Sequence, residues 1–191
     1  MIEDVQIGAF RHAGLVALPG LFAFGEIAWL REAAIALAVG HGATRDGRSF
    51  TPTTIRDVHL REPGFRKLAA HPRLLEPVRR LVGAEAGLLG TRLCLGAGFD
   101  SLANAAGEIS AVVFLDVATA ATRGGDRLGS ALLVDGAAHY RDPRPSDGTV
   151  AFVASFGAIP APADAGPTSA WLRLTAESDD CLWPNPFAAL G

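Results

Sequence analysis

The order of the predicted elements is the feature that most constrains the fold. Up to residue 83, apolar residues follow helical spacing, most clearly over 24–39, and Gly40 is a typical residue just past a helix end. From residue 84 the sequence becomes a series of short runs rich in Val, Leu and Phe, bounded by Gly, Asp or Pro. Helices first and strands afterwards predict an α+β fold, not the alternating pattern of a doubly wound sheet.

The remaining elements are predicted from apolar spacing and from the proline and glycine residues at their ends. A short helix is predicted over 3–12 and a short strand before Pro19, and residues 40–54 have the composition of a loop. Two further short helices are predicted in "EPGFRKLAAH", where Pro63 stands near a helix start, and in "HPRLLEPVRRLVG", which stops at Gly83. The predicted strands are "AGLLGTRLCLG", "EISAVVFLDVA", "GSALLVDGAAH", "GTVAFVASFGA" and "SAWLRLTAES".

Length and composition predict one globular domain. The 191 residues are treated as a single domain, 1–191, with a mainly helical part (1–83) and a mainly β barrel part (84–191). The net charge of −3 gives no basic face for nucleic acid, and the locally basic stretch 56–80 is interpreted as a solvated helical surface. The use of arginine in place of lysine, except at Lys67, suggests a bacterial source.

The cysteines and the N-terminal segment bear on the compartment. Cys94 and Cys181 are far apart and form no CxxC motif, which favours a reducing environment. The chain opens with acidic residues, and the apolar run 15–24 is short and interrupted by Pro19. We therefore expect neither a signal peptide nor a membrane span, and a cytoplasmic protein.

Several segments resemble the phytanoyl-CoA dioxygenase-like family. The segment "RDVHLREPGFRKLAAHPRLLEPVRRLVGAEAGLL" (56–89) is similar to the family's helical region, and "ISAVVFLDVATAATRGGDRLGSALLVDGAAH" (109–139) resembles a strand, turn and strand of its barrel. The opening "FRHAGLVALPGLFAFGEIAWLR" (10–31) is similar to the family's start. The resemblance implies a shortened double-stranded β-helix, a jelly-roll or cupin-like barrel, with N-terminal helices packed on it. It also implies oxygenation with Fe(II) and 2-oxoglutarate, the metal held by two histidines and a carboxylate.

The expected ligand pair is missing from the sequence. The family's first two ligands form His-x-Asp or His-x-Glu, a spacing that points both side chains to one face of a strand. Segment 93–108, which should carry this pair, contains no histidine, and Asp100 is a candidate remnant of the carboxylate. None of the five histidines has Asp or Glu two residues later; those positions hold Gly14, Ala43, Arg61, Arg73 and Arg141.

The third ligand is missing as well, and so is the co-substrate arginine unless the register slips. No histidine follows His139, and Phe156, Gly157 and Ala158 stand where the resemblance places the last ligand. Thr168 to Ala170 occupy the neighbourhood of the family's 2-oxoglutarate arginine. Arg173 is close, and is interpreted either as a surviving anion contact or as an ordinary strand arginine. We therefore predict no metal site and no cofactor.

Three other residues are candidates for metal-free acid–base chemistry. His139, Asp100 and Asp116 would lie in or near the old cavity. For His139 the alternative is a hydrogen-bonded loop histidine, and for Asp116 an aspartate that organises a turn.

Two functions from different classes follow. The first is a non-catalytic protein that binds a small apolar molecule or serves as an accessory subunit, not an active 2-oxoglutarate-dependent dioxygenase. The apolar C-terminal segment "CLWPNPF" favours a homo- or hetero-oligomer in this case. The second is an enzyme acting on a small apolar metabolite, with either a displaced metal site or metal-free acid–base chemistry.

Overall fold

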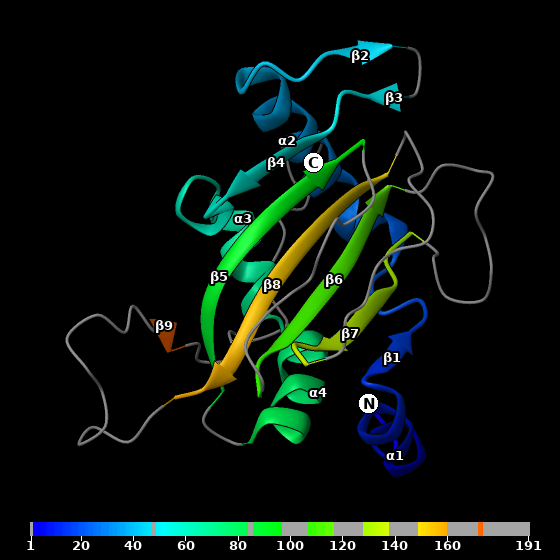
Figure 1. The fold of residues 1–191 in the computed structure, drawn as a ribbon. Coiled ribbons are helices and arrows are strands. Elements are labelled where there is room, and N and C mark those ends of the chain that lie inside the picture. Colours follow the sequence, from blue (N-terminus) through cyan, green and yellow to red (C-terminus); the bar gives the residue numbers. More distant parts are fainter. Residues whose placement is uncertain are drawn as a thin grey trace, which may run out of the picture.

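The computed structural model describes residues 2–46, 49–83, 86–96, 107–116, 128–137, 149–159 and 172–173. Within these ranges the chain forms helices that lie against one antiparallel sheet (Figure 1).

The α-helices lie where the sequence predicts them, with ends that differ by about one residue, whereas the short 3-10 helix was not predicted. They are α1 (Asp4–Ala13), α2 (Phe24–Gly40), the 3-10 helix η1 (Val58–Leu60), α3 (Pro63–Ala70) and α4 (Pro72–Val82). The Gln6 side chain accepts from the backbone N–H of Glu3 at the start of α1, and Gly14 ends this helix with a φ of 68°. Proline occupies the first turn of α3 and of α4, where its missing N–H costs no helical hydrogen bond.

The sheet is wholly antiparallel and its order differs from the sequence order. Its path is β1-β7-β6-β8-β5-β4, with β9 also paired to β5. A separate pair of two-residue strands joins β2 to β3. The strands are β1 (Leu15–Leu18), β2 (Arg45–Asp46), β3 (Ser49–Phe50), β4 (Thr53–Arg56), β5 (Ala86–Leu95), β6 (Ile109–Asp116), β7 (Ala131–Asp135), β8 (Val150–Ala158) and β9 (Leu172–Arg173).

The two faces of the sheet have different partners. Alternate residues of the central strands, such as Val113 and Phe152, join the main core, which α2, α3 and α4 complete from one side (Figure 1). Phe152 stacks on Phe65 of α3 with ring centroids 5.4 Å apart. The other set of alternating residues forms a second apolar cluster on the opposite face, which includes Val112 and Val153. We call this opposite side the second face.

Helix packing brings α2 and α3 into close contact. A Cβ atom built on Gly64 of α3 would lie 1.9 Å from Cη2 of Trp29 on α2. Only glycine therefore allows the indole to lie this close to the α3 backbone. None of the helices in the described segments has both the length and the apolar character that crossing a membrane requires.

Candidate ligand-binding site

A pocket lies on β5 between the two strands that share one of its edges. β4 pairs with Arg92 to Leu95 of β5, and β9 pairs with Gly87 and Leu88. The intervening residues 89–91 face a pocket of about 380 Å³. The pairing of β5 with β8 shifts between Leu88 and Gly90, an irregularity of the kind that often re-aims side chains beside functional sites. The pocket is lined by Arg56, Asp57, Leu89, Gly90, Thr91, Arg92, Glu108 and Ser155.

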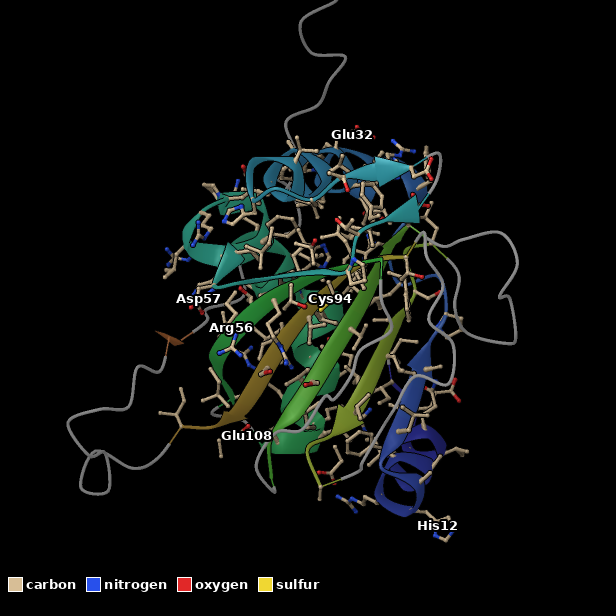
Figure 2. The ribbon with its side chains drawn as sticks, turned by 45° about the horizontal axis from the view of Figure 1, so that its top comes forward. His12, Glu32, Arg56, Asp57, Cys94 and Glu108 are labelled. Atoms are coloured by element: carbon tan, nitrogen blue, oxygen red, sulfur yellow. The ribbon has the colours of Figure 1, made fainter. Side chains whose placement is uncertain are left out.

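Two arginines stand opposite each other at this pocket. The β4–β5 register pairs Arg56 with Arg92. Arg92 is also paired with Val153 of β8, a member of the second apolar cluster, so its side chain leaves the sheet on the second face. Figure 2 shows Arg56 on this same side, together with Cys94 and Glu108. Like charges directly opposite each other on neighbouring strands destabilise a sheet, so this pair calls for an explanation.

Asp57 has an unusual backbone. Its φ of 55° places it in the left-handed region, and it is the one non-glycine residue in the described ranges with positive φ. Two hydrogen bonds hold it there: its N–H donates to the Thr91 carbonyl over 2.8 Å, and its carbonyl accepts from the Leu60 N–H over 3.0 Å. A Cβ built on Gly90 would lie 3.8 Å from the Asp57 Oδ1 atom, so the carboxyl group lies over β5. Such strained residues gather at binding sites.

Thr91 also fixes His59. The His59 backbone N–H donates to the Thr91 Oγ1 atom over 3.1 Å, and the imidazole Nδ1 lies 2.8 Å from the same oxygen. Burial lowers the pKa of His59 and the positive charge of Arg66 lowers it further, while Asp57 acts in the opposite direction. The neutral ring can therefore accept a hydrogen bond at Nδ1 from the Thr91 hydroxyl. Thr91 thus connects the pocket wall to the strained turn after β4.

The second face offers no activated thiol at Cys94. Its side chain joins the second apolar cluster, and burial raises the pKa of the thiol despite the nearby charge of Arg92. A thiol with a raised pKa stays protonated near neutral pH and is a poor nucleophile.

Of the four candidate residues predicted from sequence, Asp116 lies apart from this pocket, Arg173 lies in β9 at its border, and the others lie outside the described residues. His139 and Asp100 belong to this last group, together with the segment around Cys181. The β9 backbone at Arg173 pairs with Gly87 of β5. Phe156, one of the positions compared with the last ligand, is buried in the main core.

Asp116 has a partner in α2. Its Oδ2 atom lies 2.9 Å from Nε and 2.7 Å from Nη2 of Arg31. The carboxylate is therefore held in an ion pair that joins β6 to the helical layer.

The described part of the pocket fits an anion better than a metal. Guanidinium groups donate hydrogen bonds and do not ligate cations, whereas they suit carboxylates. In the ranges that the structure describes, no group of three or more His, Cys, Asp or Glu side chains forms a metal site. Segments 97–106 and 138–148, which contain Asp100 and His139, lie outside these ranges.

The comparisons with known proteins identify the fold. No protein-family model matches the chain, and no curated protein matches it. Among solved structures, EctD from S. alaskensis with bound Fe is 18% identical at a TM-score of 0.62, covering 82% of this chain and 77% of its own. HygX from Streptomyces hygroscopicus with nickel and 2-oxoglutarate bound is 17% identical at a TM-score of 0.62, and the match covers 82% of this chain and 87% of HygX. The non-heme alpha ketoglutarate dependent epimerase SnoN is 16% identical at a TM-score of 0.59, and the match covers 81% of this chain and 80% of SnoN.

At these identities the likeness establishes the fold alone. The chain has a jelly-roll fold like that of these structures, a shortened double-stranded β-helix with helices packed on it. The predicted fold class is therefore confirmed.

One prediction from the sequence is corrected by the same comparison. The absence of His-x-Asp/Glu led us to expect no cofactor, yet structures with this fold contain iron, or 2-oxoglutarate together with 5-hydroxyectoine. That prediction was wrong because it compared ligand positions along the sequence alone, for the ligand pair, the third histidine and the arginine. The three-dimensional fold nevertheless resembles proteins whose structures contain these groups.

The arginine pair was not predicted from the sequence. Arg56 was placed on a solvated helical surface, but it is the last residue of β4. Part of the signal was present: the alternation in "TRLCL" puts Arg92 and Cys94 on one face of a strand. The partner strand β4 is only four residues long and lies in a stretch with loop composition up to residue 54.

Proposed function

We propose that the protein binds a small molecule at the pocket beside β5, and that this binding, not oxygenation, is its function. Within the jelly-roll fold, we assign it to the phytanoyl-CoA dioxygenase-like group on the sequence segments that resemble that family.

The observation that carries the proposal is the set of groups that line the pocket. Arg56 belongs to β4, Arg92 to β5 and Ser155 to β8, and Glu108 directly precedes β6. The pocket is shallow and open to solvent, and polar groups from neighbouring strands converge on it, as they do where a ligand is oriented. The strained Asp57 and the shifted pairing of β5 add two further features common at such sites.

The residues on the pocket walls indicate the class of ligand. The sequence favoured a small apolar ligand, whereas the charged walls of this pocket favour a polar one.

Two measurements test the proposal. In the first, a library of small polar and apolar molecules is screened by thermal shift and calorimetry against the wild type and Gly90→Leu. Gly90 faces the pocket, and an added Cβ meets only the Asp57 side chain, at ordinary contact distance. The larger side chain should therefore fill the pocket while the sheet is kept, and bound molecules should lose affinity.

The second measurement addresses oxygenation directly. The chain is incubated with Fe(II), 2-oxoglutarate and the molecules found by the screen, and succinate release is followed. Succinate formation above a protein-free control would contradict a binding function. Ligands that bind Gly90→Leu as tightly as the wild type would place the binding site elsewhere.

A further inference from the structure

A second and larger pocket lies between α1 and α4, which stand at the same end of the sheet (Figure 1). Its volume is about 780 Å³, and the start of α1, the turn after β1 and the first half of α4 enclose it. Arg80 in the last turn of α4 holds α1 in place: it donates to the Ile2 carbonyl, and its Nη2 atom lies 2.6 Å from Oδ1 of Asp4. This α1–α4 pocket shares no lining residue with the pocket beside β5.

The α1–α4 pocket combines apolar surface with few hydrogen-bond donors. Aliphatic side chains and proline rings contribute to its wall, from Ile2, Leu18, Leu21, Pro19, Pro72 and Pro77. A proline has no backbone N–H, so the main chain cannot donate to a ligand at three of these positions. The apolar surface instead suits the hydrocarbon part of a small molecule.

The start of α4 provides no donor for an anion either. The Arg73 N–H donates to Nδ1 of His71 over 3.2 Å. The next two N–H groups, of Leu74 and Leu75, donate to the His71 carbonyl over 2.9 and 2.8 Å. The N–H groups with which helix starts commonly bind anions are therefore used within this helix and its cap.

The charge that remains on the wall is negative. Arg73 lines the pocket, but its Nη1 atom donates to Oε2 of Glu26 over 3.1 Å and to the Leu21 carbonyl over 3.3 Å. Glu3 and Glu76 line the same pocket, are exposed, and form no ion pair in the described part of the chain. An ionised carboxylate can only accept hydrogen bonds, so these two groups require a partner that donates.

We propose that the α1–α4 pocket binds a small amine, an ammonium group joined to an apolar body. The ammonium group donates to Glu76 or Glu3 in a charge-assisted hydrogen bond, and the apolar body lies against the leucines and prolines. A volume of about 780 Å³ is in the range of small-molecule sites. This inference goes beyond the proposed function, because it concerns a different pocket and does not depend on ligand binding beside β5.

Three probes with one apolar body test the proposal by calorimetry and thermal shift. They are n-hexylamine, which is protonated at neutral pH, 1-hexanol, which is neutral, and hexanoate, which is negative. We expect hexylamine to bind and to raise the thermal midpoint, and the other two to bind at least about tenfold more weakly. Added salt should weaken hexylamine binding because both carboxylates are exposed.

Variants of the full chain locate the bound amine. Glu76→Gln keeps the size of the side chain and removes its charge, so it should weaken hexylamine binding by at least about fivefold. The double variant Glu3→Gln/Glu76→Gln should weaken it further. Glu32→Gln, an exposed change on α2 outside the pocket, should bind hexylamine like the wild type.

Three results would overturn the inference. They are the failure of hexylamine to bind at millimolar concentration, equal affinity for the three probes, and unchanged hexylamine binding in the double variant. The proposed function is judged separately with Gly90→Leu, which should leave hexylamine binding unchanged. If Gly90→Leu removed that binding, the amine would lie beside β5, which contradicts the α1–α4 site but supports the proposed function.

Discussion

Arg31 of α2 and Asp116 of β6 form a two-point contact, with Nε and Nη2 of the arginine 2.9 and 2.7 Å from the same carboxylate oxygen. About 29% of the Asp116 side chain and 25% of the Arg31 side chain are exposed, so solvent screens the pair only partly. Asp116→Asn should lower the free energy of unfolding by about 1 kcal/mol. The measurement is urea denaturation.

A matched control for this ion pair is Glu32→Gln. Glu32 contacts the same arginine over 2.6 Å, but 71% of its side chain is exposed. Its loss should change stability by less than about 0.5 kcal/mol. Equal effects of the two variants would refute the assignment of Asp116 as the residue that anchors α2 to the sheet.

The contact of Gly64 with Trp29 predicts an unusual glycine effect. Gly64→Ala puts a methyl group into the indole ring, so it should destabilise the protein by about 1–3 kcal/mol, even though alanine favours helix. In α1, Gly8 has no atom within 4 Å of a built Cβ, so Gly8→Ala should stabilise by up to about 1 kcal/mol. Thermal or urea unfolding of both variants checks the opposite signs.

The left-handed backbone of Asp57 predicts a second pair of effects. Asp57→Gly removes the steric cost of positive φ and should leave the unfolding free energy within about 1 kcal/mol of the wild type. Asp57→Val, with a β-branched side chain, should lower it by about 1–3 kcal/mol. If valine were tolerated as well as glycine, the strain assigned to this residue would be absent.

The lowered pKa of His59 predicts loss of stability in mild acid. The folded state holds this imidazole neutral, whereas the unfolded chain protonates it near its ordinary pKa of 6.5. The unfolded state therefore binds more protons as the pH falls through that value, and stability decreases on the acid side. Urea midpoints measured from about pH 7.5 to about pH 5.5 should show this decline.

Two variants separate His59 from other acid effects. His59→Gln should flatten the decline, while His12→Gln, an exposed change on α1, should keep the slope of the wild type. An unchanged slope in His59→Gln would assign the acid sensitivity to other groups.

The main elements were predictable from the sequence because their signals are local. The helices around Pro63, Pro72 and Gly83 carry their own end signals, and the apolar runs from residue 86 became β5 to β9. The strands β2 to β4 were missed because each has at most four residues, and their pairing depends on partners far along the chain.

The candidate site was much less predictable than the fold. Arg56 and Arg92 are 36 positions apart, and only the β4–β5 register brings them together. Single-strand patterns indicate which face a residue occupies, but not which residue stands opposite it. Asp116 was singled out from sequence as a turn residue or an acid, and its partner Arg31 belongs to a helix 85 positions away.

The shared edge of β5 has a mechanical consequence. Residues 89–91 of β5 lie between two strands on this edge. One is β4 (53–56), from the first third of the chain, and the other is β9 (172–173), from its last tenth. A molecule bound in the pocket between β4 and β9 would contact both strands and hold them together reversibly. Proteolytic cleavage near β4 and cleavage near β9 should then both become slower when the pocket is occupied.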